Sequence, residues 1–322
     1  MINLGVATKI LGRAGLRVRD GRRAENSPHL SVSLLLLRDV LLYLAAQRIT
    51  CYRLASDLAP YVSHPDYPQF HGQIASCGAL LADVGDLART HAIRLTMHLD
   101  LHTTLSTPDD ALAQRASNDI IARAALLDAL DTGSNSIMVL HVGGAYDDQA
   151  AALHRFTTRF ERLPQWVRCR IAIEPDEHSF GLLELLPLHQ MIGVPIVFDT
   201  LHFQLNNRHG VALAEALGLA LATWPISIRP KVHFSTQRTE AHLQKGRAGA
   251  TARVIPPRHG QHADFISPFE FAAFLNAARG LPAFDVMLEA KAADLALLRL
   301  REDLQLFAPE LAVRVGGVGV KG

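Results

Sequence analysis

Short apolar runs rich in β-branched residues alternate with longer amphipathic segments along the whole chain. The short runs predict eight strands, at residues 3–7, 49–55, 93–99, 136–142, 171–175, 195–200, 231–235 and 284–290. The longer segments have apolar residues at three- and four-residue spacing, which predicts helices at 31–47, 74–91, 109–130, 148–162, 179–192, 211–222, 268–278 and 292–306. Alternating strands and helices of this number predict a (β/α)₈ TIM barrel, a parallel fold of the α/β class.

The barrel is expected to form a single domain over residues 1–307. Neither an internal repeat nor a linker long enough to divide the chain interrupts the pattern, and barrels of this size are common as one domain. Residues 308–322 are rich in glycine and valine, and we expect them to form a flexible tail.

The composition is typical of a globular protein. Apolar residues make up 49% of the 322 residues and charged residues 20%, which excludes a disordered chain. The longest apolar stretch is interrupted by Arg38 and Asp39, so no membrane segment is expected. The amino terminus lacks the features of an export signal, and Cys51, Cys77 and Cys169 have no paired spacing. We therefore expect a cytoplasmic protein without disulfides, and a monomer.

Two long connections are unusually basic. The first has six basic residues and one acidic residue between Lys9 and Arg23, and the second has seven and one between Arg229 and His262. We expect both to follow the carboxyl ends of strands, which form the active face of a TIM barrel. They predict an anionic partner at that face. If charge alone is considered, both runs could instead be ordinary solvated surface. The expected nucleic-acid contacts are Arg19, Arg22, Arg238, Lys245 and Arg247.

Six consecutive predicted strands carry residues that can bind metal near their carboxyl ends. They supply His98, His141, Glu174, Asp199 with His202, His233 and Glu289. Any one of them alone could be a hydrogen-bonded core residue, but a buried ring of imidazoles and carboxylates is costly without cations. Mixed nitrogen and oxygen donors favour manganese, zinc or iron over magnesium or calcium. The donors suffice for two or three divalent ions; we expect Mn²⁺, with Zn²⁺ or iron as alternatives.

The motifs around these residues resemble those of the UV damage endonucleases, DNA repair nucleases related in fold to endonuclease IV. The matching stretches follow the family's order along nearly the whole chain. They are YRLASDLAP (52–60), SHP (63–65), MH (97–98), HVGGAY (141–146), AIE (172–174), GVPIVFDTLH (193–202), PKVH (230–233) and DVMLEAK (285–291).

This resemblance implies a three-ion site that hydrolyses a DNA phosphodiester bond on the 5′ side of a lesion, with damaged double-stranded DNA as the partner. By motif match its metal ligands are His64, His98, His141, Glu174, Asp199, His202, His233, His262 and Glu289. The residues with expected catalytic roles are Lys231, Glu174 and Asp199. Lys231 matches a lysine that some members carry in carboxylated form, which would make it a further anionic ligand.

The chain departs from the family where its members probe the lesion. The family has a proline, a glutamine and an aromatic residue after the third-strand histidine, whereas this chain has Leu99, Leu101 and His102, and Val6 replaces an aromatic residue in the first strand. Either a UV photoproduct or an abasic site therefore remains open as substrate. Two alternative functions are left open by the sequence. A sugar isomerase or epimerase is disfavoured by the basic loops, and a non-catalytic damage sensor would not need the set of metal ligands.

Overall fold

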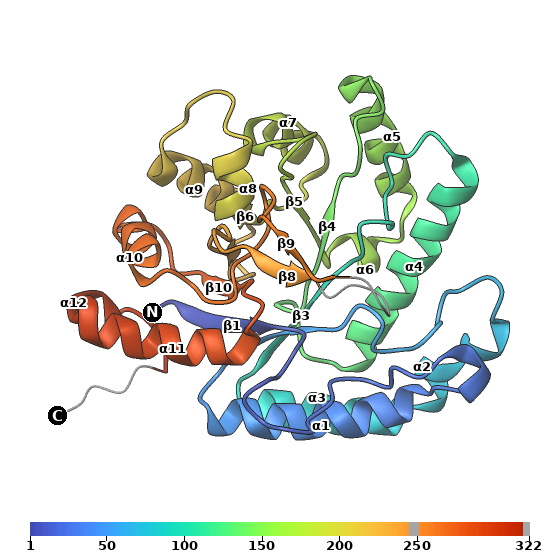
Figure 1. Ribbon diagram of the computed structural model, residues 1–322. Coiled ribbons are helices and arrows are strands. Elements are labelled where there is room, and N and C mark those ends of the chain that lie inside the picture. The colour runs from blue at the N-terminus through green and yellow to red at the C-terminus, as the bar shows by residue number, and fades with distance from the viewer. Residues whose placement is uncertain (245–250, 318–322) are drawn as a thin grey trace.

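Eight parallel strands form a barrel in the computed structural model, which describes residues 1–244 and 251–317 (Figure 1). The strands are β1 Asn3–Ala7, β2 Cys51–Leu54, β3 Arg94–His98, β4 Met138–His141, β5 Ile171–Glu174, β6 Phe198–Asp199, β7 Lys231–Phe234 and β10 Asp285–Leu288. They pair in the order β5-β4-β3-β2-β1-β10-β7-β6, and a parallel bridge between Ile173 and Ile196 joins the two ends. The predicted TIM barrel is confirmed.

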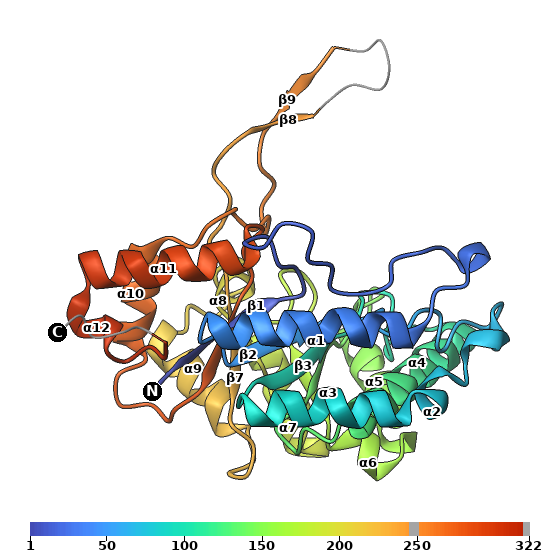
Figure 2. The ribbon, with the colours of Figure 1, turned by 90° about the horizontal axis from the view of Figure 1, so that it is seen from below.

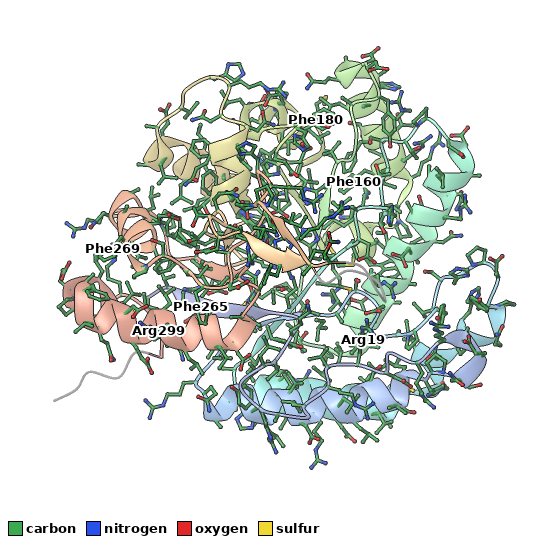
Figure 3. The ribbon with its side chains drawn as sticks, in the orientation of Figure 1. Arg19, Phe160, Phe180, Phe265, Phe269 and Arg299 are labelled. Atoms are coloured by element: carbon green, nitrogen blue, oxygen red, sulfur yellow. The ribbon has the colours of Figure 1, made fainter. Side chains whose placement is uncertain are left out.

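Helices surround the barrel, as the amphipathic pattern predicts. They are α1 Leu30–Ala46, α3 Gly78–Thr90, α4 Asp110–Ala129, α5 Gln149–Arg162, α7 Leu182–Ile192, α9 Leu213–Ala222, α10 Pro268–Ala277 and α11 Ala293–Phe307. The side chains of Asp109, Asp148 and Ser267 cap α4, α5 and α10, which explains where these helices begin. Phe160 on α5 and Phe180 before α7, both labelled in Figure 3, are buried in the hydrophobic core. No helix in the described ranges is long and apolar enough to cross a membrane.

Several short elements have no counterpart in the sequence prediction, because fewer than two turns show no hydrophobic period. They are η1 Ala24–Asn26, η2 Pro68–Phe70, α6 Gln165–Arg168, α8 Thr200–Leu205 and α12 Pro309–Ala312. The most important is α8, because it begins directly after Asp199 and carries His202. The predicted helix 74–91 is divided into α2 Gln73–Ser76 and α3.

The loop after β7 contains a hairpin that the sequence pattern also did not predict. β8 (His242–Gln244) pairs antiparallel with β9 (Arg253–Ile255), and Figure 2 shows the hairpin standing clear of the barrel. Leu243 and Val254 are paired in the ladder and are about two-thirds exposed. A bridge between Gln237 and His262 closes the base of the loop, so the chain returns to the barrel mouth at His262.

The segment expected to be a flexible tail is packed against the barrel as far as Gly317. Leu311, Ala312 and Val315 are buried. Val315 forms a parallel bridge with Ile2, and the Gly316 amide donates to the Ile2 carbonyl at 2.7 Å. The prediction was therefore wrong for residues 308–317, because their apolar side chains cover the amino ends of the strands; residues 318–322 lie outside the described part.

A buried carboxylate anchors the first βα loop to the start of α11. The Asp294 carboxylate accepts hydrogen bonds from the amides of Leu11 (2.6 Å) and Gly12 (2.9 Å) and from the Tyr43 hydroxyl (2.6 Å). A Cβ atom on Gly12 would lie 2.6 Å from both the Asp294 Oδ2 and the Tyr43 hydroxyl, so a larger residue does not fit without rearrangement. The start of the basic loop is thereby fixed to the barrel.

Removing the hydroxyl in Tyr43→Phe is expected to lower the free energy of unfolding by about 1.5–3 kcal/mol, because the buried hydrogen bond has a charged acceptor. Urea unfolding followed by circular dichroism measures the change. Tyr146→Phe, at a partly exposed tyrosine, is the matched control and should be close to wild type. Equal midpoints for Tyr43→Phe and wild type would show that the hydroxyl does not stabilise the anchor.

Candidate metal centre

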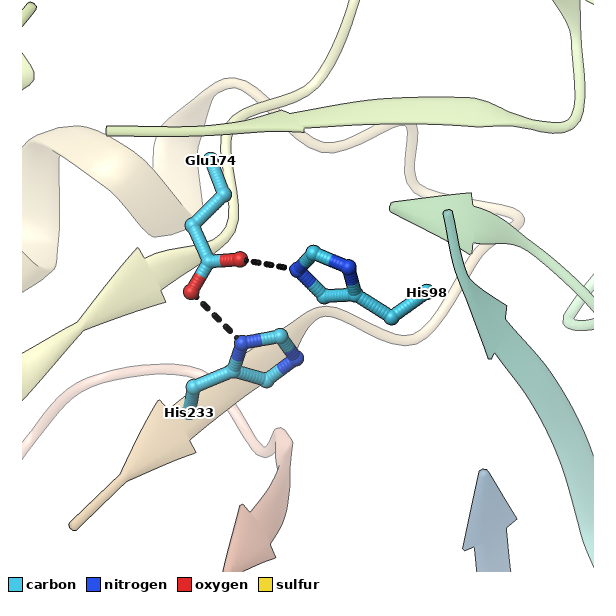
Figure 4. Close-up of side chains that lie close together, drawn as sticks. All are labelled: His98, Glu174 and His233. Atoms are coloured by element: carbon cyan, nitrogen blue, oxygen red, sulfur yellow. Dashed lines mark hydrogen bonds and ion pairs between the residues drawn. The ribbon is translucent and has the colours of Figure 1, made fainter. Parts of the chain in front are cut away.

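The Glu174 carboxylate, at the end of β5, lies at the centre of a histidine cluster in the barrel mouth. Its Oε2 lies 2.7 Å from His98 Nε2, and its Oε1 lies 2.7 Å from His233 Nδ1 (Figure 4). His141 Nε2 is 3.7 Å from Oε2, and His202 Nε2 is 4.0 Å from Oε1. These side chains come from β3, β4, β5, β7 and α8. The parallel strands thus bring together residues that are far apart in the sequence.

Two further carboxylates complete the cluster. Glu289 Oε1 lies 3.5 Å from His233 Nδ1, and its Oε2 lies 3.8 Å from His262 Nε2. Asp199 Oδ1 accepts hydrogen bonds from the amides of Leu201 and His202, both at 2.8 Å, and so caps α8. Asp199 Oδ2 and His233 Nε2 are buried and have no hydrogen-bond partner among the described residues.

Within the described part of the chain, three sets of residues in this cluster could each hold an ion, because the donor atoms of each set lie within 4.8 Å of one another. They are His98, Glu174 and His233; Glu174, Asp199 and His202; and Asp199, His233 and Glu289. Glu174, Asp199 and His233 each belong to two sets, so neighbouring ions would share ligands. The donors are imidazole nitrogens and carboxylate oxygens, the mixture that suits manganese, zinc or iron.

The electrostatics of the cluster also fit cations. Burial raises the pKa of Asp199 to about 8, and the charges of Glu174 and Glu289 add to this effect. Burial lowers the pKa of His233 to about 4, so its ring is neutral and has a lone pair to donate. Although burial opposes ionisation of Glu174, His233 and His98 hold its pKa well below the ordinary value. A divalent ion would compensate these crowded carboxylates and satisfy the two unpartnered atoms.

Glu177 supports His202 and was not identified from the sequence. Its Oε2 lies 3.1 Å from His202 Nδ1, which leaves Nε2 of the same ring facing Glu174. The nearby His202 ring lowers the pKa of Glu177 to about 2. Burial alone would lower the pKa of His202, but Glu177 and the other nearby carboxylates raise it to about 10. Carboxylates that orient a ligating histidine in this way are common behind metal sites. In the sequence, Glu177 could have been recognised as an acidic residue three positions after Glu174.

Arg53 was also missed as a site residue. It lies on β2, forms an ion pair with Glu289, and its side chain is 16% exposed. Burial alone would raise the pKa of Glu289, but Arg53 lowers it below its ordinary value. The signal was a charged residue inside the otherwise apolar strand Cys51–Leu54.

Lys231 is fully buried at the start of β7, two residues before His233. Its Nζ donates a hydrogen bond to Thr96 Oγ1 at 3.1 Å. Burial and the nearby Arg53 lower the pKa of Lys231 to about 7. The ammonium form is therefore poorly stabilised in this interior.

All of the predicted ligands except His64 lie in this cluster. His64 instead lines a separate pocket of about 580 Å³ together with Arg19, Arg22 and His102. Its Nδ1 accepts a hydrogen bond from the Asp66 amide at 3.2 Å, and its ring packs against Tyr61 and Tyr67. These local contacts in the loop after β2 hold the ring, and the structure does not bring it to the carboxylates.

The predicted lesion-probing residues lie in the loop after β3. Leu101 is 76% exposed, and His102 is exposed at the edge of the same 580 Å³ pocket. Val6 and Leu99 are buried, so neither presents a side chain to a ligand at the surface.

The predicted DNA-contacting arginines are less free than the sequence suggests. Arg19 pairs with Asp57 at 2.5 Å, Arg22 with Asp20 at 2.6 Å, and Arg238 with Asp264 at 2.7 Å. The Arg238 side chain is only 11% exposed, so it holds its own loop together. Lys245 and Arg247 lie outside the described residues.

Two residues of the second basic run lie away from the active face. Arg229 precedes β7 and pairs with Asp285 at 2.6 Å at the amino ends of the strands, and Lys231 lies inside the barrel. Neither belongs to the loop at the active face. Among the described residues of this loop, Arg253 and Arg258 are exposed.

The family model and two individual relatives that match this chain are all described as UV endonucleases. Residues 29–316 match the model of the family described as UV-endonuclease UvdE. The chain is 29% identical over 264 residues to a UV DNA damage endonuclease of Bacillus velezensis, covering 81% of this chain and 77% of the relative. It is 30% identical over 268 residues to one from Bacillus cereus, covering 82% and 78%.

Solved structures show the same barrel. The crystal structure of SacUVDE superposes with a TM-score of 0.80 at 24% identity, covering 95% of this chain and 99% of that one. A 3-keto-D-glucoside 4-epimerase from E. coli has a TM-score of 0.57 at 11% identity, covering 94% and 100%. At these identities the likeness concerns the fold.

Proposed function

Because this chain belongs to the UV-endonuclease UvdE family, we propose that it is a metal-dependent DNA repair endonuclease that incises the backbone on the 5′ side of a lesion. The observation that carries the metal dependence is the Glu174 cluster, with its three overlapping ligand sets and the unpartnered atoms Asp199 Oδ2 and His233 Nε2. The substrate is damaged double-stranded DNA. A cytoplasmic, monomeric protein remains the expectation from the sequence.

Two or three divalent ions, expected to be Mn²⁺, would supply Lewis-acid activation of water and of the scissile phosphate. The chain provides the frame for this chemistry. Glu174 and Asp199 are the carboxylates shared between ligand sets, and Glu177 keeps the ring of His202 in place. No side chain has to act as a nucleophile. His64 remains a proposed ligand on the resemblance alone.

Lys231 is proposed to act in carboxylated form, on the strength of the family resemblance. Its complete burial below His233 and beside Arg53 supports this proposal, because an ammonium ion is disfavoured there. Carboxylation would convert the side chain into an anion that faces the ligand cluster.

Metal analysis of the purified protein, followed by nicking assays on duplexes with one defined lesion, tests the proposal. We expect two or three transition-metal ions per chain and single nicks 5′ to the lesion, abolished by chelator and restored by Mn²⁺. A protein that binds lesion duplexes tightly but nicks none with any of these metals would instead be a damage sensor. Sugar epimerisation without DNA binding would favour the epimerase alternative.

Duplex binding is expected to weaken steeply with rising salt, with part of this dependence arising from the hairpin. The double variant Arg253→Ala, Arg258→Ala should reduce the slope of log affinity against log salt by up to about 2, since each phosphate contact contributes about 0.9. The control is Arg162→Ala, Arg279→Ala, because these exposed arginines lie at or just after the carboxyl ends of α5 and α10, near the amino ends of the strands. Equal slopes for both variants and wild type would exclude the hairpin from the DNA contact.

A further inference from the structure

A second small pocket shares a wall with the metal centre and is lined by two lysines. It has a volume of about 360 Å³, and its lining includes Thr8, Lys9, Arg53, His262, Glu289 and Lys291. His262 and Glu289 also belong to the ligand cluster, so the pocket opens beside the proposed ions. Neither Lys9 nor Lys291 has a role in the site described so far.

The presence of two lysines in one pocket is unusual for this chain. Only five of its 32 basic residues are lysines, at positions 9, 231, 245, 291 and 321. The arginines near the barrel are largely committed to carboxylates, as Arg53 is to Glu289 and Arg229 to Asp285. Lys9 and Lys291 are exposed, so their ammonium groups can meet a ligand.

The charge of the pocket favours an anion. Arg53, Lys9 and Lys291 contribute three positive charges, whereas Glu289 is the only carboxylate among the described residues of its lining. The pairing of Arg53 with Glu289 leaves the two lysines as the uncompensated charge. An ammonium group on a flexible stem binds phosphate oxygens as a point charge without requiring one orientation.

The backbone that carries each lysine is held firmly. Before Lys9, the Thr8 amide donates to the Arg53 carbonyl at 2.9 Å, and the Thr8 carbonyl accepts from the Tyr52 hydroxyl at 2.7 Å. The Lys291 amide donates to the Ala263 carbonyl at 3.1 Å, next to His262. The backbone positions of the two lysines are therefore fixed relative to His262 and Glu289.

We propose that Lys9 and Lys291 bind a phosphate group of the DNA backbone that neighbours the phosphate at the metal centre. This inference rests on the proposed function. The shared wall supports it, because consecutive phosphates of one strand would occupy the metal centre and the adjoining pocket. A phosphorylated sugar could offer the same chemical group, so the experiment must separate the two sources.

The test combines lysine variants with neutralised phosphates. Lys9→Met and Lys291→Met remove charge at similar length, and Lys291→Arg retains it. Lesion duplexes each carry one uncharged methylphosphonate, placed at successive positions near the lesion on the incised strand. Holoenzyme kcat/KM is measured for every pair of protein and duplex.

On the unmodified duplex each methionine variant is expected to lose about tenfold in kcat/KM, mainly through KM, as for a lost hydrogen bond to a charged group. The salt slope should fall by about 0.9 per lysine. With the methylphosphonate at the phosphate that the lysines contact, the kcat/KM of the wild type should fall by a similar factor. The kcat/KM of each methionine variant should fall little below its own value on the unmodified duplex. Lys291→Arg should recover most of the activity, and Arg279→Met, on the opposite face, should match wild type.

One outcome is that the wild type incises DNA while the loss from the lysine substitution and the loss from the methylphosphonate are independent, and so multiply, at every position. In that case the lysines do not contact a backbone phosphate and the inference is wrong. If the wild type neither binds nor incises any duplex, the proposed function fails first. Binding of ribose 5-phosphate in calorimetry, lost in the methionine variants while DNA incision is unaffected, would assign the pocket to a small phosphorylated ligand and would also overturn the inference.

Discussion

Glu174→Ala is expected to lose most of the bound metal and to reduce incision by roughly 10³-fold or more. Both oxygens of Glu174 contact histidines at 2.7 Å, and this residue belongs to two of the three ligand sets. Its removal would deprive more than one ion of a ligand and leave His98 and His233 without their partner. A factor of this size corresponds to about 4 kcal/mol of transition-state stabilisation, which is within what bound ions supply.

Metal content by mass spectrometry, measured together with the nicking rate, checks this result. Glu215→Ala removes an exposed carboxylate on α9 and is the matched control, expected to keep full metal content and activity. Circular dichroism confirms that both variants are folded. Full metal content in the double variant Glu174→Ala, His233→Ala would contradict the assignment of the metal centre.

Incision at abasic sites is expected to equal or exceed incision at pyrimidine dimers. Opening an intact dimer requires compensation for the lost stacking, and a glutamine and an aromatic residue would provide it in the family pattern. Here Leu101 offers no hydrogen bond, and His102, at the edge of the pocket lined by His64 and Arg19, has a smaller stacking surface. An abasic site already lacks a base, so it needs less compensation.

The variant Leu101→Gln, His102→Tyr should gain on dimers by roughly fivefold or more, since stacking on an aromatic ring contributes about 1–3 kcal/mol per base. Activity at abasic sites should change little. Parallel nicking assays of both proteins on the two substrates measure the ratio. Both side chains are exposed, so the substitutions should not disturb folding. A wild type that clearly prefers dimers would show that the loop after β3 does not set the preference.

The sequence by itself was sufficient for the barrel and for most of the ligand cluster. The spacing of apolar residues in a strand or helix indicates which face is buried, and this spacing can be read from residues that are close together in the sequence. Once the strands are parallel, their carboxyl ends must meet, so His98, Glu174 and Glu289 converge although 191 positions separate the first from the last. Local pattern and topology together determine this part of the site.

Only the tertiary structure decided which side chains pair. The contact of Arg53 with Glu289, the support of His202 by Glu177, and the commitment of Arg238 to Asp264 depend on how strands and loops are positioned around the closed barrel. The same holds for the hairpin and for the pocket of Lys9 and Lys291. Loop geometry and contacts between strands are set by packing over the whole molecule, and a period along the chain carries no information about them.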